Sequence, residues 1–277
     1  MRQALPILVA YDGSVDADQA LVWAADEASG VGAPIRVVIV DEVVSSEWDD
    51  NVLVRGGPEV LARAEKALQD AEVSDSSVER HSGPVVPELL ALAESASMLV
   101  VGSQGHGRVG EALIGSVSQH LARHAACSVV VVREPPTPEP KRIVVGVDGS
   151  PTSNAAIEFA CRRAERLHTS VAALHGWKVH TPSTDMFASD PRSIDLAQDK
   201  ELLLAESVAG VRAAHPDVDL LQEAIPVAPA QILVDASAVA SLVVVGSRGR
   251  GFFSGLLLGS VSQEVVQRAH CSVAVIR

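Results

Sequence analysis

The sequence predicts an α/β protein of two tandem domains, each an open five-stranded parallel sheet with helices layered on both faces in Rossmann-like fashion. Short aliphatic and β-branched runs alternate with Ala-rich stretches at helical spacing, which is typical of parallel strands joined by helices. The segment ILVAYDGS (residues 7–14) recurs as IVVGVDGS (143–150), and LIGSVSQHLARHAACSVVVVR (113–133) recurs as LLGSVSQEVVQRAHCSVAVIR (257–277). Such self-similarity indicates a tandem repeat of one structural unit.

The first copy reads as alternating strands and helices. The apolar run Ile7–Ala10 predicts a strand that ends in an Asp-Gly-Ser turn, and Ala17–Ser29 predicts a helix from its apolar spacing. The β-branched run Ile35–Val40 predicts a second strand, and Pro58–Gln69 predicts a helix with proline in its first turn. The next elements are expected as a helix, a strand, a helix and a strand at Val85–Ser95, Met98–Val101, Ser116–Ala125 and Ser128–Val132.

Composition and length bound the class of protein. The chain has 277 residues, 47% of them hydrophobic, and a net charge of −13. That apolar content excludes intrinsic disorder, and the acidic surface argues against a nucleic-acid partner. Residues 134–140 hold four prolines, which cannot continue a helix or a central strand. We therefore expect domains at residues 1–134 and 141–277, with a Pro-rich linker at 135–140.

From the sequence we expect no targeting signal. The first apolar run is short and meets Asp12, so it predicts neither a signal peptide nor a membrane span. The three cysteines are far apart, and no disulfide framework follows from their spacing. We expect a cytoplasmic protein with no membrane partner.

A glycine loop follows the strand at Met98–Val101 and recurs in the second copy. The spacing is G-x2-G-x9-G-S, carried by Gly102, Gly105, Gly115 and Ser116, and again by Gly246, Gly249, Gly259 and Ser260. Glycines let a backbone approach an anion, and a helix N-terminus suits a phosphate. A serine there could cap the helix or donate to the phosphate. The alternative is a tight turn before an ordinary capped helix. Ligands of such sheets lie beyond the carboxyl ends of strands, which here carry Asp12, Asp148 and the glycine loops.

Other motifs in the chain match known nucleotide-binding or metal-binding patterns only in part. Residues 105–110 match GxGxxG, yet they follow a late strand and lack the acidic residue about 20 positions on. Residues 110–116 have P-loop glycine spacing without the lysine. His120 and His124 have a spacing that can hold a metal, but the second copy has Glu264 and Arg268 there, which favours a solvated helix face. We assign no catalytic residue and no metal ligand.

At these positions the chain resembles the universal stress protein family in its tandem form. Both copies carry V-x-x-D-G-S, G-x2-G-x9-G-S and a following S-V-S, and the resemblance covers nearly the whole chain. It implies domains of the adenine nucleotide α-hydrolase type. It also implies that members with these glycines bind ATP, with or without Mg²⁺.

The resemblance further implies which residues contact the nucleotide. Asp12 and Asp148 would lie against it, and the second strand's end, at Val40 and Gly176, would face adenine. Arg108, Arg248 and Arg250 could pair with phosphates or with local acidic groups. The expected contacts are Ala10, Asp12, Val40, Gly102, Ser103, Gln104, Gly105, His106, Gly107, Arg108, Gly115, Ser116, Val117, Gly146, Asp148, Gly176, Gly246, Ser247, Arg248, Gly249, Arg250, Gly251, Gly259, Ser260 and Val261.

Two classes of function fit these residues. The first is an ATP-binding, nucleotide-dependent stress-response module with weak or no hydrolysis, at most a slow ATPase. The second is a nucleotide-processing enzyme of the α-hydrolase type, an AMP-forming ligase or an ATPase. That class has an SGGxDS-like loop after its first strand, whereas this chain keeps only Asp-Gly-Ser. The first class is favoured.

The expected partners are an adenine nucleotide and a protein that the sequence does not identify. The final runs Ser128–Val132 and Ser272–Ile276 are apolar and would leave each sheet with an edge that needs covering. We expect the two domains to pair through these strands within one chain, with a homodimer as a further option.

Overall fold

The computed structural model of the chain describes residues 4–46, 49–55, 58–73, 75–105, 114–134, 142–178, 191–250 and 258–277. The chain divides into two compact units, Met1–Glu134 and Pro135–Arg277. Each unit is described by itself.

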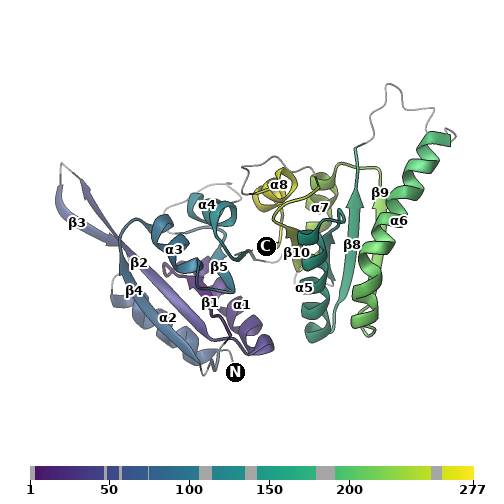
Figure 1. Ribbon diagram of the computed structural model, residues 1–277. Coiled ribbons are helices and arrows are strands. Elements are labelled where there is room, and N and C mark those ends of the chain that lie inside the picture. Colours follow the sequence, from purple (N-terminus) through teal and green to yellow (C-terminus); the bar gives the residue numbers. More distant parts are fainter. Residues whose placement is uncertain are drawn as a thin grey trace. The chain divides into compact units, whose positions relative to one another are not determined.

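The first unit is a parallel sheet with helices between its strands (Figure 1). The order across the parallel sheet is β4-β2-β1-β5-β6, and β3 pairs antiparallel with the far end of β2. Helices α1 and α2 pack together on one side, and α3 and α4 pack together on the other (Figure 1). The elements are β1 (Ile7–Ala10), α1 (Val15–Val31), β2 (Ile35–Ser46), β3 (Asp49–Arg55), α2 (Pro58–Asp70), β4 (Ser76–Ser82), α3 (Val85–Ala93), β5 (Met98–Gly102), α4 (Ser116–His124) and β6 (Ser128–Val132).

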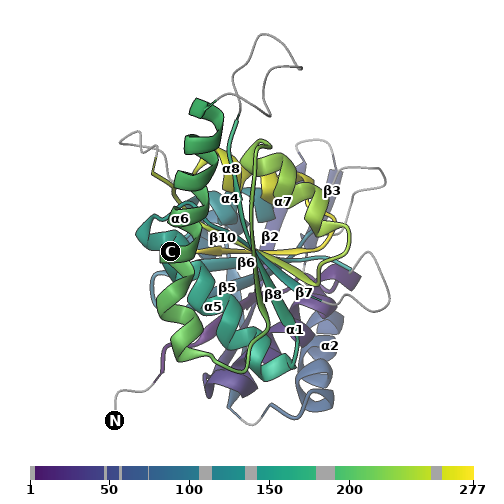
Figure 2. The same ribbon diagram turned by 90° about the vertical axis from the view of Figure 1, so that its right-hand side faces the viewer.

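The second unit repeats this plan with the strand order β9-β8-β7-β10-β11, all parallel. Helices α5 and α6 lie side by side (Figure 2), and α7 packs against α8. The elements are β7 (Arg142–Gly146), α5 (Pro151–Leu167), β8 (Ser170–Gly176), α6 (Pro191–Ala214), β9 (Leu220–Ile225), α7 (Pro229–Ser237), β10 (Leu242–Gly246), α8 (Ser260–Arg268) and β11 (Ser272–Ile276). The predicted α/β fold with parallel sheets is confirmed.

The apolar runs seen in the sequence form the centre of each sheet. Leu8, Val9 and Val100 are completely buried in the first unit, as are Val243 and Val244 in the second. Strands covered by helices on both faces must bury both sets of alternating side chains. This explains why these strands read as continuous aliphatic runs rather than as an alternating pattern.

Two parts of the first unit differ from the elements expected from the sequence. The strand β4 has the sequence SSVERHS, with side chains that are exposed or half-buried, so it carries no apolar run. The strand β2 continues to Ser46 and forms an antiparallel pair with β3. The strand β4 lies at the edge of the parallel sheet, where burial on both faces is no longer required, whereas β2 lies between β4 and β1 and buries Val37, Val38 and Ile39.

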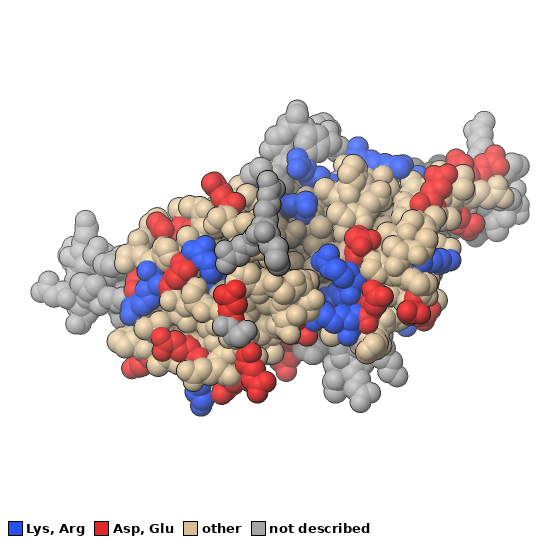
Figure 3. Space-filling view, turned by 60° about the horizontal axis from the view of Figure 1, so that its bottom comes forward, with Lys and Arg blue, Asp and Glu red and all other residues tan. Residues whose placement is uncertain are grey.

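The surface carries charges of both signs. On the face shown in Figure 3, acidic and basic side chains are interspersed over the described residues. Within the ranges that the structure describes, none of the helices combines the length and the apolar character that a membrane crossing needs.

A histidine ties the end of α6 to α5 in the second unit. His215 Nδ1 lies 2.8 Å from Glu165 Oε2, and Nε2 lies 3.1 Å from Glu158 Oε1. These hydrogen bonds, the one with Glu158 first, raise the pKa of His215 above its ordinary value of 6.5. The imidazole of His215 therefore binds a proton more tightly in the folded chain than in the unfolded chain.

We predict that this contact stabilises the fold at low pH and is lost as the pH rises. Because the folded-state pKa is raised, the contribution is complete below pH 6.5 and disappears as the pH passes through the folded-state value. The variant His215→Gln should reduce the free energy of unfolding at pH 6 and have much less effect at pH 9. Urea denaturation at the two pH values measures this, with the exposed His270→Gln as control. An equal effect of His215→Gln at both values would contradict the prediction.

Candidate functional site

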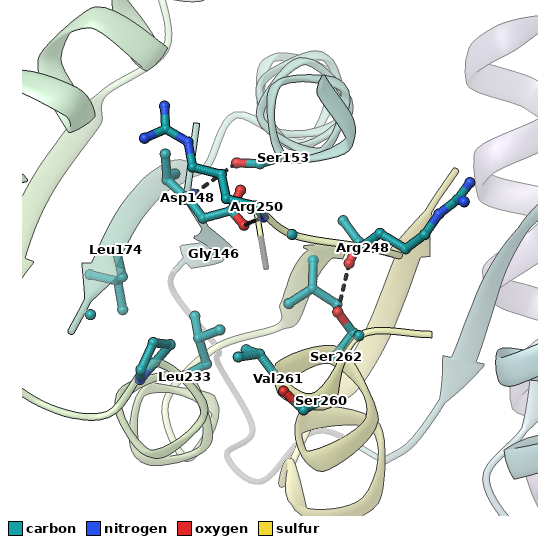
Figure 4. Close-up of a pocket in the computed structure, with 17 residues that line it drawn as sticks. Gly146, Asp148, Ser153, Leu174, Leu233, Arg248, Arg250, Ser260, Val261 and Ser262 are labelled. Carbon is teal, nitrogen blue, oxygen red and sulfur yellow. Dashed lines mark hydrogen bonds between the residues drawn. The ribbon is translucent and has the colours of Figure 1, made fainter. Parts of the chain in front are cut away.

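Each unit has a cavity at the carboxyl ends of its central strands. The cavity of the first unit has a volume of about 330 Å³, and that of the second has about 280 Å³. Each lies where the first strand, the glycine loop and the helix after that loop meet, as Figure 4 shows for the second unit. The switch point of a parallel sheet is the usual position for a ligand.

A turn after the first strand forms one side of each cavity. The Ser14 amide donates to Asp12 Oδ1 at 2.9 Å, and the Ser150 amide donates to Asp148 Oδ1 at the same distance. The glycine between them has a φ of +81° in the first unit and +74° in the second, a conformation that favours glycine. The aspartate therefore closes the turn and presents its second carboxylate oxygen toward the glycine loop.

The glycine loop is fastened in the same way in both units. In the first, the Ser103 amide donates to the Val132 carbonyl at 2.8 Å, and the Gly115 amide donates to the Ser103 carbonyl at 2.7 Å. In the second, Ser247 and Gly259 make the same bonds at 2.7 and 2.8 Å. The described ends of each loop are thus held by the last strand and by each other.

A serine inside the next helix adds a further bond to each loop. Ser118 Oγ donates to the Gly102 carbonyl at 2.7 Å, and Ser262 Oγ donates to the Gly246 carbonyl at 2.6 Å. Both serines also line their cavities. The sequence pattern S-V-S, present in both copies, was the available signal for these two residues, which are absent from the predicted contacts.

The first two glycines of the motif are required by contacts within the protein. A β-carbon on Gly102 would lie 2.7 Å from the Asp16 β-carbon, and one on Gly105 would lie 2.6 Å from Asp12 Oδ2. In the second unit, a β-carbon on Gly249 would lie 2.3 Å from Asp148 Oδ2. The sequence argument explained these glycines by close approach to an anion. The structure gives a different reason, because the space for each β-carbon is already taken by α1 or by the strand-one aspartate.

The helix after each glycine loop begins without a side-chain cap. Gly115 is the N-cap of α4 and Gly259 is the N-cap of α8, and neither cap has a side chain to accept from the first-turn amides. By contrast, Ser14 and Ser150 cap α1 and α5. Ser116 is the first residue of its helix, so of the two roles considered for this serine, capping the helix is excluded. The first-turn residues of both helices line the cavities, and no side chain among the described residues caps their amides, so these amides are candidate donors to a ligand.

Apolar side chains also line each cavity and form a wall. In the first unit it is formed by Val38, Val40, Val85, Leu89 and Val101. In the second it is formed by Leu174, Pro229, Leu233 and Val245, with glycine at 176. A β-carbon on Gly176 would meet the Val227 carbonyl at 2.7 Å, so the turn before α7 packs directly on this glycine. The two cavities therefore share a plan but differ in the shape of this wall.

Most residues predicted from the sequence line the two cavities. In the first unit these are Ala10, Asp12, Val40, Gly102, Gln104, Gly105, Gly115, Ser116 and Val117. In the second they are Gly146, Asp148, Gly176, Gly246, Arg248, Gly249, Arg250, Gly259, Ser260 and Val261.

The remaining predicted residues fall into two groups. Ser103 and Ser247 are buried and do not line the cavities. The Ser103 hydroxyl donates instead to Asp16 of α1. The predicted contacts His106, Gly107, Arg108 and Gly251 lie outside the described residues.

The two arginines of the second loop extend away from the apolar wall (Figure 4). The Arg250 amide donates to Asp148 Oδ2 at 3.1 Å, and the Arg250 guanidinium donates to the Gly149 carbonyl at 3.5 Å. Arg250 therefore fastens the loop to the strand-one turn through its backbone, and its charged group lies over that turn.

In the first unit, the residue before Asp12 brings a polar network to the cavity. Tyr11 lines the cavity, and its hydroxyl donates to Asp18 Oδ1 at 2.5 Å. Arg63, from α2, pairs with the same aspartate. Burial, and then the hydrogen bond with Asp18, raise the pKa of Tyr11 above its ordinary value. The second unit has Val147 at this position.

Within the described ranges, no cluster of three or more metal-ligating side chains occurs.

Comparisons of sequence and of structure with known proteins all point to one protein family. The sequence model of the universal stress protein family matches residues 5–133 and again 139–277. The chain is 35% identical over 296 residues to universal stress protein Rv2005c of Mycobacterium tuberculosis, covering 100% of this chain and 98% of that protein. It is 34% identical over 303 residues to Rv1996 of the same organism, covering 99% and 95%. A universal stress protein structure from Archaeoglobus fulgidus superposes with a TM-score of 0.67 at 21% identity, covering 99% of each chain.

Proposed function

Because the chain belongs to the universal stress protein family through both of its halves, we propose that it is a regulatory module that binds one ATP in each half. Hydrolysis in this proposal is slow or absent. Nucleotide occupancy changes the affinity of the chain for a protein partner in the cytoplasm. The nucleotide binds with or without Mg²⁺.

The observation that carries this proposal is an uncapped helix start and an apolar wall in one cavity, present in both units. The first-turn amides of α4 and α8 provide donors and a partial positive charge, which suit a phosphate chain. The wall around Leu89 and Leu233 provides an apolar surface, which suits a base. A nucleotide is a ligand that combines these two chemistries.

The aspartates favour binding over rapid hydrolysis. Asp12 and Asp148 already accept backbone hydrogen bonds from the turn that follows them. Asp148 also accepts from the Arg250 amide. A general base for hydrolysis must be free to take a proton from water, whereas these carboxylates hold the turn and the loop together.

The proposal predicts two adenine nucleotides per chain. Freshly purified protein should release ATP or ADP on denaturation, as identified by mass spectrometry. Calorimetric titration of nucleotide-free protein with ATP, with and without Mg²⁺, should give a stoichiometry of two. Phosphate release over hours should stay near the rate of the uncatalysed control. Release of FMN, a stoichiometry of zero, or multiple-turnover phosphate release within minutes would each overturn the proposal.

A further inference from the structure

The two glycine loops make the same contacts at their described ends but differ where they pack on the helix after the first strand. The amides and carbonyls of Ser103 and Ser247 have matching partners, at 2.7–2.8 Å in both units. The bonds from Ser118 and Ser262 also match, at 2.7 and 2.6 Å. The two units therefore differ in the contacts between the glycine loop and the helix after the first strand, while these other loop contacts are the same.

In the first unit, a carboxylate holds the loop. Asp16 lies in the first turn of α1, and its Oδ2 accepts from Ser103 Oγ at 2.6 Å and from the Gln104 amide at 2.8 Å. Both donors belong to the glycine loop. Hydrogen bonds to an ionised acceptor are shorter and stronger than those between neutral groups.

In the second unit, Thr152 stands at the corresponding position of α5. Its Oγ1 donates to the Arg248 carbonyl at 2.5 Å, and Ser150 Oγ lies 3.3 Å from the same carbonyl. The Thr152 hydroxyl donates its proton to the Arg248 carbonyl, and it makes no hydrogen bond to the loop serine of the kind that Asp16 makes in the first unit. As a result, the hydroxyl oxygen of Ser247 is buried with no hydrogen-bond partner among the described residues, and the residue is 1% exposed.

A buried polar group without a partner disfavours the conformation that buries it. The second loop therefore gains from rearrangements that bring Ser247 to water or to a new acceptor. The first loop loses two charge-assisted bonds in any such rearrangement. Preorganisation of this kind lowers the cost of binding and slows release.

We propose that Asp16 is a positioning residue that fixes the first glycine loop, and that its replacement by Thr152 leaves the second loop more loosely held. The two sites consequently release nucleotide at different rates, the first more slowly. This inference rests on the proposed function for its kinetic part. Its structural part concerns the free protein and does not depend on a ligand.

Hydrogen exchange at the Gln104 amide tests the structural part without nucleotide. In Asp16→Ala, exchange measured by NMR should accelerate at least tenfold. In Asp16→Asn, an amide oxygen can take the place of Oδ2 and accept from both donors, so most of the protection should return. Asp70→Ala, at an exposed position of α2, serves as control. Unchanged exchange in Asp16→Ala would overturn the proposal.

Release of the fluorescent analogue N-methylanthraniloyl-ATP, chased by excess ATP, tests the kinetic part. The parent should show a slow and a fast phase. Asp16→Ala should accelerate only the slow phase several-fold, and Thr152→Asp should slow only the fast phase. Simple charge repulsion predicts the opposite sign for both variants, because one removes a negative charge near the phosphates and the other adds one. Those opposite signs, or a single phase that neither variant changes, would overturn the kinetic part. If the parent binds no analogue, the proposed function fails, and hydrogen exchange alone decides the role of Asp16.

Discussion

Gly105→Val is expected to remove the first nucleotide site and leave the second intact, and Gly249→Val is expected to do the reverse. A β-carbon at these positions would lie 2.6 Å from Asp12 Oδ2 and 2.3 Å from Asp148 Oδ2. Either the aspartate rotates away and gives up its hydrogen bonds to the turn and, in the second unit, to the Arg250 amide, or the loop separates from the turn. Both changes disturb the geometry that holds the phosphates in the proposed site. Loss of charge-assisted hydrogen bonds, each contributing about 1.5–3 kcal/mol, would weaken binding at the altered site at least tenfold.

Calorimetry should report one ATP per chain for each glycine variant and two for the parent. Gly210→Val is the matched control, since a β-carbon there has no heavy atom within 4 Å. Asp12→Ala and Asp148→Ala should weaken binding less than the glycine variants, because they remove a contact without forcing the loop away. Two sites of unchanged affinity in either glycine variant would contradict this account.

The first glycine of each motif is expected to affect stability more than binding. A β-carbon on Gly102 would lie 2.8 Å from the backbone carbonyl carbon of Asp16, and one on Gly246 would lie 2.9 Å from the Ser153 amide nitrogen. Backbone atoms at the start of α1 and α5 cannot move aside as a side chain can. Gly102→Ala and Gly246→Ala should each lower the free energy of unfolding by about 1–3 kcal/mol, the usual cost of overpacking.

Urea denaturation measures this effect, and Gly259→Ala is the control from the same motif. A β-carbon on Gly259 would meet its nearest atom, the Ser247 carbonyl oxygen, at 3.5 Å, which is an ordinary contact. Gly259→Ala should therefore lower the denaturation midpoint much less than Gly246→Ala does, through the poorer N-cap alone. Equal midpoints for Gly246→Ala and Gly259→Ala would show that the packing of the loop on α5 does not set the requirement for glycine.

The buried strands of this fold could be predicted from the sequence, whereas the polar edge strand β4 could not. Runs such as Met98–Val101 and Ser128–Val132 are aliphatic because helices cover both of their faces. The edge strand β4 consists of Ser, Val, Glu, Arg and His, and Arg36 on β2 pairs with its Glu79. Its place in the sheet depends on hydrogen bonds to β2 and on such ion pairs, which leave no apolar pattern.

The position of the candidate site was also predictable, but the reasons for its residues were not. The repeated glycine spacing and the strand-end rule together led to residues that line one cavity in each unit. The bond between Ser103 and Asp16 joins residues far apart in the chain, and no local pattern reveals it. The same holds for the contact that excludes a β-carbon at Gly105, because it requires the positions of two separate turns.

The contact between the strand-one aspartate and the second motif glycine also constrains how a copy of this domain can change over generations. Replacing Gly105 while Asp12 remains creates a steric conflict, but replacing Asp12 first removes the atom that a new β-carbon would meet. A duplicated half that drifts away from binding can therefore lose the carboxylate and then the glycine through folded intermediates. Losing the glycine before the aspartate would pass through an intermediate with a steric conflict. Relatives without the glycine should accordingly lack the aspartate, while some relatives without the aspartate should still keep the glycine.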